Sequence, residues 1–328
     1  MTTPLEEMAE AAWSRILPFL RPIEALICDA EISEIMINGD RVVFFEKDGR
    51  IECADGLTIS ERSLQVAARN IARALGDEIS EEKPVLDSRL PDGSRVAVVL
   101  APISVNGTAM SIRKFQNKRY NAEELVRLGT LTGEVVAELK RATLARRNIL
   151  ISGGAGSGKT TLLNALASFI PDEERVIVIE DTSEIQIDKP NLVRFEERKA
   201  QPNLPAVTIR ELLKASLRMR PDRILLGEVR GAEAFDLLQA LNTGHSGTLS
   251  TIHANSAPQS LTRLTTCVMM AGIELPHKAV RSQIGDGIHL LVHLERRQGK
   301  RIVTQVFAVK AYDAILDRYD LEAIYENP

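Results

Sequence analysis

Residues 153–161 read GGAGSGKTT. This stretch follows the apolar run NILIS at 148–152 and precedes the apolar run LLNAL at 162–166, so we expect a short buried strand, a loop and a helix. The pattern G-x-x-x-x-G-K-[ST] is met within it, in the context that a phosphate-binding loop requires. A glycine-rich turn with a solvated lysine is the alternative, and the strand-then-helix context disfavours it. The stretch therefore predicts a nucleotide-phosphate site.

Each part of this loop has an expected task. Glycines let the backbone curl so that successive N–H groups point at an anion, and the N-terminus of the following helix adds its positive dipole end. Lys159 is expected to neutralise the β- and γ-phosphates of a nucleotide, and the Thr160 hydroxyl to ligate Mg²⁺. The expected nucleotide-binding residues are Gly153, Gly154, Ala155, Gly156, Ser157, Gly158, Lys159, Thr160 and Thr161.

Bulk composition excludes several classes of protein. The 328 residues are 44% hydrophobic and 26% charged, which is typical of globular chains long enough for two domains. A net charge of −4 gives no general electrostatic reason to bind nucleic acid or anionic lipid. The three cysteines are scattered, so neither a disulfide framework nor a zinc site is indicated. Acidic residues stand where a signal peptide would be apolar, so we expect a cytoplasmic protein that reaches membranes through partners or its surface.

The first part of the chain predicts a separate α+β domain over residues 1–115. Residues 1–27 have apolar positions at helical spacing and predict a helical extension broken by prolines. Residues 32–52 read as short strands separated by Asn-Gly and Asp-Gly, so a β-meander is expected. A capping box at 58–61 (TISE) predicts a helix, and further strands follow up to residue 115.

The rest of the chain predicts a second domain. Residues 116–129 are polar and loosely patterned, which indicates an interdomain linker. Residues 130–328 begin with a helix over 132–147 whose apolar face includes Leu144. Strands and helices then alternate and a β-hairpin follows, so the fold class is α/β, a three-layer sandwich around a mainly parallel sheet.

Several strands of the second domain end on polar side chains, and ligands of open parallel sheets bind at such ends. Splitting off a γ-phosphate needs charge neutralisation, a metal, a group that positions or deprotonates water, and often an arginine. Glu228 is the first choice for water activation and a water-mediated Mg²⁺ contact, and Glu180 is the second choice for base or metal ligand. His253 can donate a hydrogen bond to the γ-phosphate. Without the P-loop, both acids would be interpreted as caps or salt-bridge partners.

Two arginines of the first domain, Arg95 and Arg113, stand at the start and end of predicted strands. From the residues alone, each is interpreted as a surface arginine. Residues 117–119 (NKR) lack the aspartate of the guanine-specificity pattern N-K-x-D, so a GTPase is disfavoured.

Four segments in order resemble the secretion ATPase superfamily of type II and type IV secretion, pilus machines and conjugation. They are GGAGSGKTT, VIEDTSEIQ, LRMRPDRILLGEVRGAEAFD and TGHSGTLSTIHANS, similar to the Walker A, Asp box, Walker B and His box. The likeness is dense over residues 85–270, and ISEIMINGD at 32–40 resembles the start of the family's N-terminal domain. It implies a RecA-like ATPase domain, a homohexameric ring and a nucleotide bound between the N- and C-terminal domains.

The resemblance also assigns roles to several arginines. Carried over by position, Arg95 and Arg113 become N-domain arginines that reach the phosphates, which reverses their interpretation as surface residues. Arg220, Arg223 and Arg230, around the Walker B segment, become candidates for inter-subunit contacts.

The branch within the superfamily is inferred from length and from one absence. The type II secretion and pilus-extension branch usually has a four-cysteine zinc site, which this sequence lacks. The tight-adherence pilus branch (CpaF-like) shares much of the sequence of these motifs but usually has a longer N-terminal extension. The conjugal-transfer (TrbB-like) and type IV secretion branch fits better.

The sequence therefore predicts a Mg²⁺-dependent ATPase that drives substrate or DNA transfer, or pilus biogenesis, at the periphery of the inner membrane. Expected partners are inner-membrane secretion or pilus platform proteins and other secretion ATPases, with no direct nucleic-acid binding indicated. A nucleic-acid motor or helicase on a RecA-like core is the rival from another class, and the acidic balance speaks against it. A ring that binds ATP without hydrolysis is disfavoured by Lys159, Thr160 and Glu228.

Overall fold

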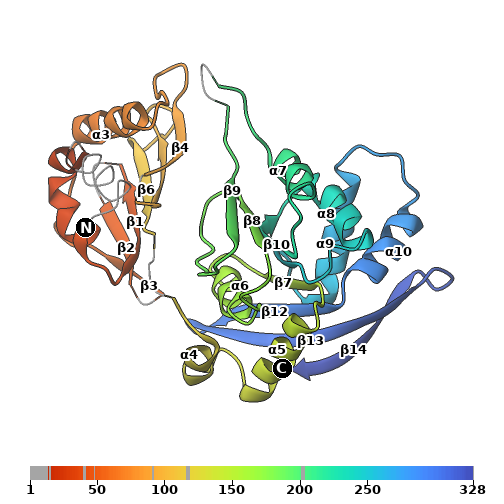
Figure 1. The fold of residues 1–328 in the computed structure, drawn as a ribbon. Coiled ribbons are helices and arrows are strands. Elements are labelled where there is room, and N and C mark those ends of the chain that lie inside the picture. The colour runs from red at the N-terminus through yellow and green to blue at the C-terminus, as the bar shows by residue number, and fades with distance from the viewer. Residues whose placement is uncertain are drawn as a thin grey trace. The chain divides into compact units, whose positions relative to one another are not determined.

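The computed structural model describes residues 14–327, except 15, 40, 41, 48, 91, 116–118 and 201–203 (Figure 1). The chain divides into two compact units, one comprising Met1–Lys118 and Gln201–Leu204 and the other comprising Arg119–Ala200 and Pro205–Pro328. The expected helix over residues 1–27 lies largely outside the described residues. Its later part contains η1 (Leu17–Phe19), η2 (Arg21–Ile23) and α2 (Glu24–Cys28). The domain boundaries expected at residues 115 and 130 stay predictions.

The first unit contains a six-stranded antiparallel sheet in the order β3-β2-β1-β6-β5-β4. Its strands are β1 (Ile32–Asn38), β2 (Val42–Lys47), β3 (Arg50–Cys53), β4 (Val85–Arg89), β5 (Arg95–Val99) and β6 (Ala109–Arg113). The helix α3 (Glu61–Ala74) places Leu64, Ala68 and Ile71 in the core that the strands form. The unit is α+β, as predicted.

The start of α3 differs from the prediction. The N-cap is Ser60, whose side chain accepts a hydrogen bond from the backbone N–H of Ser63, and not Thr58. The carboxylate of Glu61 instead accepts hydrogen bonds from the N–H, at 2.7 Å, and the hydroxyl of Thr108. Glu61 thus ties α3 to the residue before β6, a long-range contact that local sequence does not reveal.

The second unit is built on an eight-stranded sheet in the order β14-β13-β12-β7-β11-β10-β8-β9. Its strands are β7 (Ile149–Gly153), β8 (Val176–Glu180), β9 (Leu192–Glu196), β10 (Arg223–Val229), β11 (Leu249–Ile252), β12 (Leu290–Arg297), β13 (Lys300–Asp313) and β14 (Arg318–Glu326). The six strands from β12 to β9 run parallel, and β13 and β14 are antiparallel additions at one edge. The mainly parallel sheet is confirmed.

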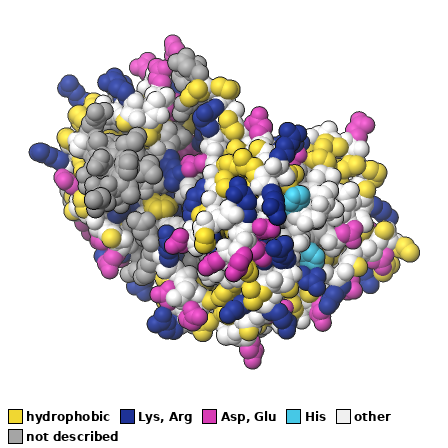
Figure 2. Space-filling model, in the orientation of Figure 1, with side chains coloured by type: hydrophobic (Ala, Val, Ile, Leu, Met, Phe, Trp, Pro, Cys, Tyr) yellow, Lys and Arg dark blue, Asp and Glu magenta, His cyan; other side chains and the backbone are white. Residues whose placement is uncertain are grey.

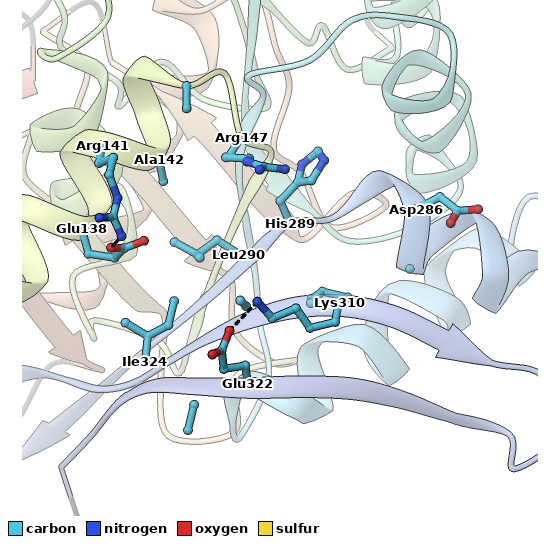
Figure 3. Close-up of a pocket in the computed structure, with 15 residues that line it drawn as sticks. Glu138, Arg141, Ala142, Arg147, Asp286, His289, Leu290, Lys310, Glu322 and Ile324 are labelled. Atoms are coloured by element: carbon cyan, nitrogen blue, oxygen red, sulfur yellow. Dashed lines mark hydrogen bonds and ion pairs between the residues drawn. The ribbon is translucent and has the colours of Figure 1, made fainter.

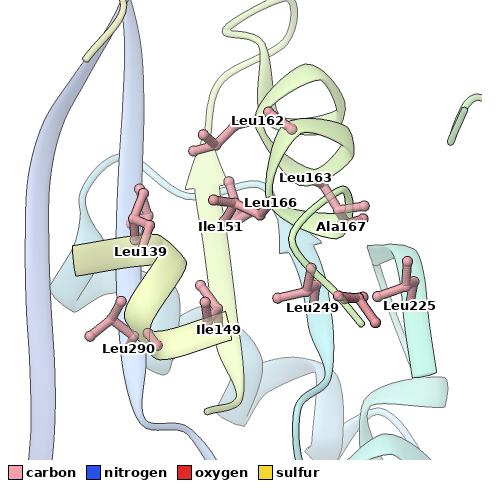
Figure 4. Close-up of a cluster of buried hydrophobic side chains, with 14 of the residues drawn as sticks. Leu139, Ile149, Ile151, Leu162, Leu163, Leu166, Ala167, Leu225, Leu249 and Leu290 are labelled. Atoms are coloured by element: carbon pink, nitrogen blue, oxygen red, sulfur yellow. The ribbon is translucent and has the colours of Figure 1, made fainter. Parts of the chain in front are cut away.

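Helices cover both faces of this sheet, because its strands are apolar on both sides. In β7, Ile149 and Ile151 join one core and Leu150 joins the other. The first core, in part shown in Figure 4, also takes Leu139 of α5 and Leu162 of α6. One face carries α4 (Ala122–Arg127), α5 (Gly133–Leu144) and α6 (Lys159–Ala167). The other carries α7 (Ile209–Ser216), α8 (Glu233–Asn242), α9 (Ala257–Met269) and α10 (His277–Gly287). The predicted three-layer sandwich is confirmed.

The segment 116–129, predicted as a linker, contains the helix α4, because Asn121 and Glu124 form a reciprocal capping box and Leu125 is buried in the core. Its role as a linker stays a prediction. The prediction that Leu144 belongs to the apolar face of its helix is wrong, because this last residue of α5 is 48% exposed. Within the described part of the chain, no helix is both long enough and apolar enough to cross a membrane.

Candidate active site

The P-loop connects the end of β7 to the start of α6, as expected. Gly153 ends the strand, and a Cβ placed on it would lie 2.4 Å from the carbonyl oxygen of Leu294 in β12. Gly158 caps α6 with a φ of +97°, a conformation that other residues rarely adopt. The two glycines of the motif are therefore required by packing and by backbone geometry.

Lys159 folds back over this loop. It is the first residue of α6 and only 8% exposed. Its Nζ donates hydrogen bonds to the carbonyl oxygens of Gly153, at 3.1 Å, and Gly154, at 2.9 Å. A buried ammonium needs such acceptors, and phosphate oxygens would be stronger ones. The lysine is thus held at the loop to which a phosphate would bind.

Lys159, His253 and Glu228 form a continuous chain of contacts. Nζ of Lys159 lies 3.5 Å from both ring nitrogens of His253, and Nε2 of His253 lies 3.1 Å from Oε1 of Glu228. These residues follow or end β7, β11 and β10, which are consecutive strands in the sheet. The carboxyl ends of parallel strands thus bring together three residues that lie far apart in sequence.

The environment of His253 favours the neutral imidazole. Burial lowers its pKa most, the nearby Lys159 lowers it further, and Glu228 opposes both. A neutral ring has one N–H donor and one acceptor, so His253 can still donate to an anion at neutral pH.

The two oxygens of Glu228 differ. Oε2 accepts a 2.9 Å hydrogen bond from Arg230, whose guanidinium also donates to Asp181 at 2.7 Å. Oε1 is buried, and among the described residues no donor is aligned to bond it; the contact with His253 has the distance but not the geometry. A buried carboxylate oxygen in this state is suited to accept a proton or hydrogen bond from a water molecule.

Oxygen ligands suited to Mg²⁺ are present. Thr160 is the second residue of α6, and its hydroxyl belongs to the P-loop motif. The unpartnered Oε1 of Glu228 is a second oxygen donor. In the described ranges, no group of three or more His, Cys, Asp or Glu side chains is placed to hold a metal. P-loop Mg²⁺ takes most of its ligands from water and phosphate, so these residues fit the ion.

Glu180 lies at the end of β8 and is only 2% exposed. Its Oε1 accepts two hydrogen bonds of 2.8 Å, from the backbone N–H groups of Glu184 and Ile185. Burial raises its pKa to about 7 although these two bonds lower it. A Cβ on Gly227 would lie 3.0 Å from its Cγ, so Glu180 is next to the residue before Glu228. Its role as metal ligand or base stays a prediction.

The arginines around the Walker B segment separate into three cases. Arg223 is fully buried and pairs with Glu174, so its predicted contact with a neighbouring subunit is wrong. Arg230 is half-exposed and binds Glu228 and Asp181 of its own chain. Arg220 is exposed, and its inter-subunit role stays a prediction.

The first unit contains a row of arginines that includes one the sequence did not single out. Arg95 begins β5, and its register partners are Arg89 on β4 and Arg113 on β6. Like charges directly opposite each other in a sheet are unfavourable, and Asp87, 3.7 Å from Arg95, offsets part of this charge. A bound anion would offset more of it. Pairing the strands across the turn at residues 90–94 would have identified Arg89. The contact of Arg95 and Arg113 with phosphates stays a prediction.

A cavity of about 850 Å³ lies at the opposite end of the sheet from the P-loop. Its lining includes Arg147 and His289, which precede β7 and β12 (Figure 3). Lys310 and Glu322 pair within it. The cavity is therefore separate from the strand ends that form the candidate active site. On the face drawn in Figure 2, basic and acidic side chains are interspersed.

Comparisons with known proteins agree on one family. The family model described as type II/IV secretion system protein matches residues 19–310. The chain is 36% identical over 288 residues to conjugal transfer protein TrbB of Rhizobium radiobacter, covering 87% of this chain and 85% of that protein. It is 31% identical over 343 residues to type IV secretion system protein VirB11 of Bartonella quintana, covering 94% and 96%.

A further match spans only part of its partner. An uncharacterized protein of Methanocaldococcus jannaschii is 40% identical over 236 residues, which cover 70% of this chain and 33% of that protein.

The X-ray structure of the Legionella pneumophila ATPase DotB has the same fold, with a TM-score of 0.59 at 18% identity over 90% of this chain and 80% of that one. The resemblance inferred from the four motifs is confirmed: the chain belongs to the type II/IV secretion system protein family.

Proposed function

We propose that this chain is a Mg²⁺-dependent ATPase that powers substrate or DNA transfer, or pilus biogenesis, in a type IV secretion or conjugation apparatus. The observation that carries the proposal is the chain of contacts from Lys159 through His253 to Glu228. An ammonium group, an imidazole and a carboxylate are thus in contact at the carboxyl-end edge of three adjacent strands, which supports the proposal. These are the groups that hydrolysis of a γ-phosphate requires.

Each residue of this chain of contacts has a separate part in hydrolysis. The ammonium of Lys159 exchanges its two carbonyl acceptors for phosphate oxygens and neutralises their charge. Oε1 of Glu228 orients and deprotonates the attacking water, while Arg230 holds Oε2 in place. His253 donates its N–H to the γ-phosphate. Thr160, Glu228 and Glu180 would hold Mg²⁺ directly or through water, and the ion would neutralise charge on the phosphates.

The proposal also covers the oligomer that the chain forms and its partners. We propose a homohexameric ring in which Arg95 and Arg113 of the N-terminal unit reach the phosphates. The named relatives TrbB and VirB11 belong to conjugal transfer and type IV secretion, which supports a place beside inner-membrane platform proteins and other secretion ATPases. Association with the membrane is then peripheral, on its cytoplasmic side.

Phosphate release from ATP by the full chain tests the proposal. Wild type is compared with Lys159→Ala, with Mg²⁺ and with EDTA, and Lys278→Ala on the exposed start of α10 is the matched control. Hydrolysis is expected only with Mg²⁺, to be lost in Lys159→Ala and to be kept in the control, with unchanged circular dichroism. Undiminished hydrolysis in Lys159→Ala would overturn the assignment. Strong stimulation by single-stranded DNA would favour a nucleic-acid motor instead.

A further inference from the structure

The hairpin between β12 and β13 is fixed beside the P-loop by the sheet itself. β12 pairs in parallel with β7, and Leu294 is the register partner of Gly153. The hairpin continues past this point to a tight two-residue turn at Gln298 and Gly299, which have φ values of +50° and +81°. Its position next to the phosphate-binding loop is therefore set by strand pairing.

Two arginines of this hairpin converge on the P-loop. Nε of Arg301 donates a 3.1 Å hydrogen bond to the carbonyl oxygen of Gly156. The Cδ of Arg301 lies 3.1 Å from where a Cβ of Gly158 would be, so its side chain crosses the loop just before α6. Nη1 of Arg296 lies 3.7 Å from the corresponding position on Gly156. Both guanidinium groups thus lie against the loop residues that precede Lys159.

These two arginines are also direct register partners across the hairpin. Like charges at directly opposite sheet positions repel each other. An anion bound between them and the loop would convert the repulsion into attraction. A guanidinium carries five N–H donors, and the contact with Gly156 uses only one of those on Arg301. Further donors are therefore available to a phosphate.

The opposite face of the hairpin supplies an internal comparison. Arg297 and Lys300 are the neighbouring register pair, and side chains alternate between faces along a strand. Arg297 donates a 2.9 Å hydrogen bond to Glu295. The hairpin therefore has one basic pair toward the P-loop and one on its other side.

We propose that Arg301 and Arg296 are a phosphate-binding pair that completes the P-loop from the hairpin of the same chain. The ligand is the di- or triphosphate group of the nucleotide. This inference rests on the proposed function only in requiring that a nucleotide binds at residues 153–161. The pair acts on nucleotide affinity and leaves water activation to Glu228.

Binding of ADP to the full-length chain tests the pair. Arg301→Ala is expected to weaken ADP binding about tenfold, the effect of losing a charge-assisted hydrogen bond, and to reduce the dependence of affinity on salt. Arg301→Lys keeps the charge without the planar fork, and should recover part of the affinity and most of the salt dependence. Lys300→Ala removes the same charge from the other face, and should change affinity less than twofold. Arg296→Ala should weaken ADP binding and reduce its salt dependence in the same way as Arg301→Ala.

Two further readouts separate phosphate binding from support of the fold. In the absence of nucleotide, Arg301→Ala should melt within a few degrees of wild type. In steady-state hydrolysis its KM should rise while kcat changes little. Equal affinities of Arg301→Ala and Lys300→Ala would overturn the inference. So would weaker binding by Arg301→Ala with unchanged salt dependence and a strongly lowered melting temperature.

Failure of the proposed function gives a different result. A wild-type chain that binds ADP but releases no phosphate from ATP would contradict hydrolysis, while the affinity differences among these variants would still decide the role of the pair.

Discussion

The backbone N–H of Ile185 donates a 2.8 Å hydrogen bond to Oε1 of Glu180, and the N–H of Glu184 donates to the same atom. These bonds connect the end of β8 to the segment that follows it. They do not fully offset burial, which raises the pKa of Glu180 from 4.5 to about 7. The folded chain therefore keeps a proton on Glu180 at pH values where the unfolded chain has released it.

We predict a pH-dependent effect of Glu180→Gln on stability. Between about pH 4.5 and pH 7 the wild type should lose free energy of unfolding as pH rises, because only its unfolded state ionises there, and above pH 7 this loss levels off. Glutamine cannot ionise but still accepts the two N–H bonds. Relative to wild type, Glu180→Gln should therefore gain on the order of 3 kcal/mol across this window. Urea unfolding at pH 5 and pH 8, in EDTA without nucleotide, measures the gain.

Glu184→Gln is the comparison for this prediction, since it keeps the backbone N–H bond to Glu180 and removes only a nearby negative charge, the last of the causes that raise the pKa of Glu180. Relative to wild type, the free energy of unfolding of Glu184→Gln should change much less between pH 5 and pH 8 than that of Glu180→Gln. Parallel stability curves for wild type and Glu180→Gln would contradict the expectation.

Glu228→Gln should separate binding from hydrolysis. The amide keeps the size of the side chain but is not a base, so hydrolysis should fall about 100-fold or more while ATP binding is kept. Filter binding of ATP and single-turnover phosphate release measure the two steps. Loss of ATP binding, with hydrolysis lost only as a consequence, would mean that Glu228 holds the nucleotide and does not activate water.

Much of the site could be predicted from sequence, for a geometric reason. The P-loop pattern marks one strand end, and parallel strands bring their carboxyl ends to one edge, so Glu228 and His253 were expected near Lys159. The contacts of 3.1 Å and 3.5 Å agree with that expectation. The apolar run at 148–152 likewise predicted a buried strand, and the side chains of β7 do alternate between the two cores.

Other features depend on long-range pairing that local patterns do not contain. Arg301 and Gly156 are 145 positions apart in sequence. They are in contact only because β13 folds back beside β12, which pairs with β7. The burial of Arg223 depends on acceptors from distant segments, Glu174 and the carbonyl oxygens of Thr143 and Gly247. Arg223 begins β10 and follows a proline and an aspartate, a local sequence that is typical of the protein surface. Only the tertiary structure shows that its side chain is internal.

Arg223→Ala should destabilise the second unit strongly. It removes one of the two arginines that pair with Glu174, since Arg146 stays, together with the buried donor to the carbonyl oxygens of Thr143 and Gly247. A cost of about 1–3 kcal/mol is expected for these lost buried hydrogen bonds. Arg220→Ala, three residues away and exposed, should change stability by less than about 0.5 kcal/mol. Urea unfolding monitored by circular dichroism measures both. Equal stability of Arg223→Ala and Arg220→Ala would contradict the structural role of Arg223.

The row Arg89, Arg95 and Arg113 gives the sharpest test of the N-terminal unit. If these side chains reach the phosphates during hydrolysis, each alanine variant should lower kcat by about 10- to 100-fold, the loss expected for one charge-assisted contact made in the transition state. Arg73→Ala, exposed in the last turn of α3, is the control from the same unit and should keep wild-type activity. Steady-state phosphate release measures these rates.

The three arginines also separate the two interpretations of this row. A phosphate contact predicts that Arg113→Lys recovers part of the activity, because charge is kept, and that the effects of Arg95→Ala and Arg113→Ala combine non-additively, since both side chains act on one anion. A surface role predicts wild-type rates in every single variant. Reduced rates in Arg89→Ala alone would assign the contact to β4 and leave Arg95 and Arg113 as surface residues, contrary to what the family resemblance implies.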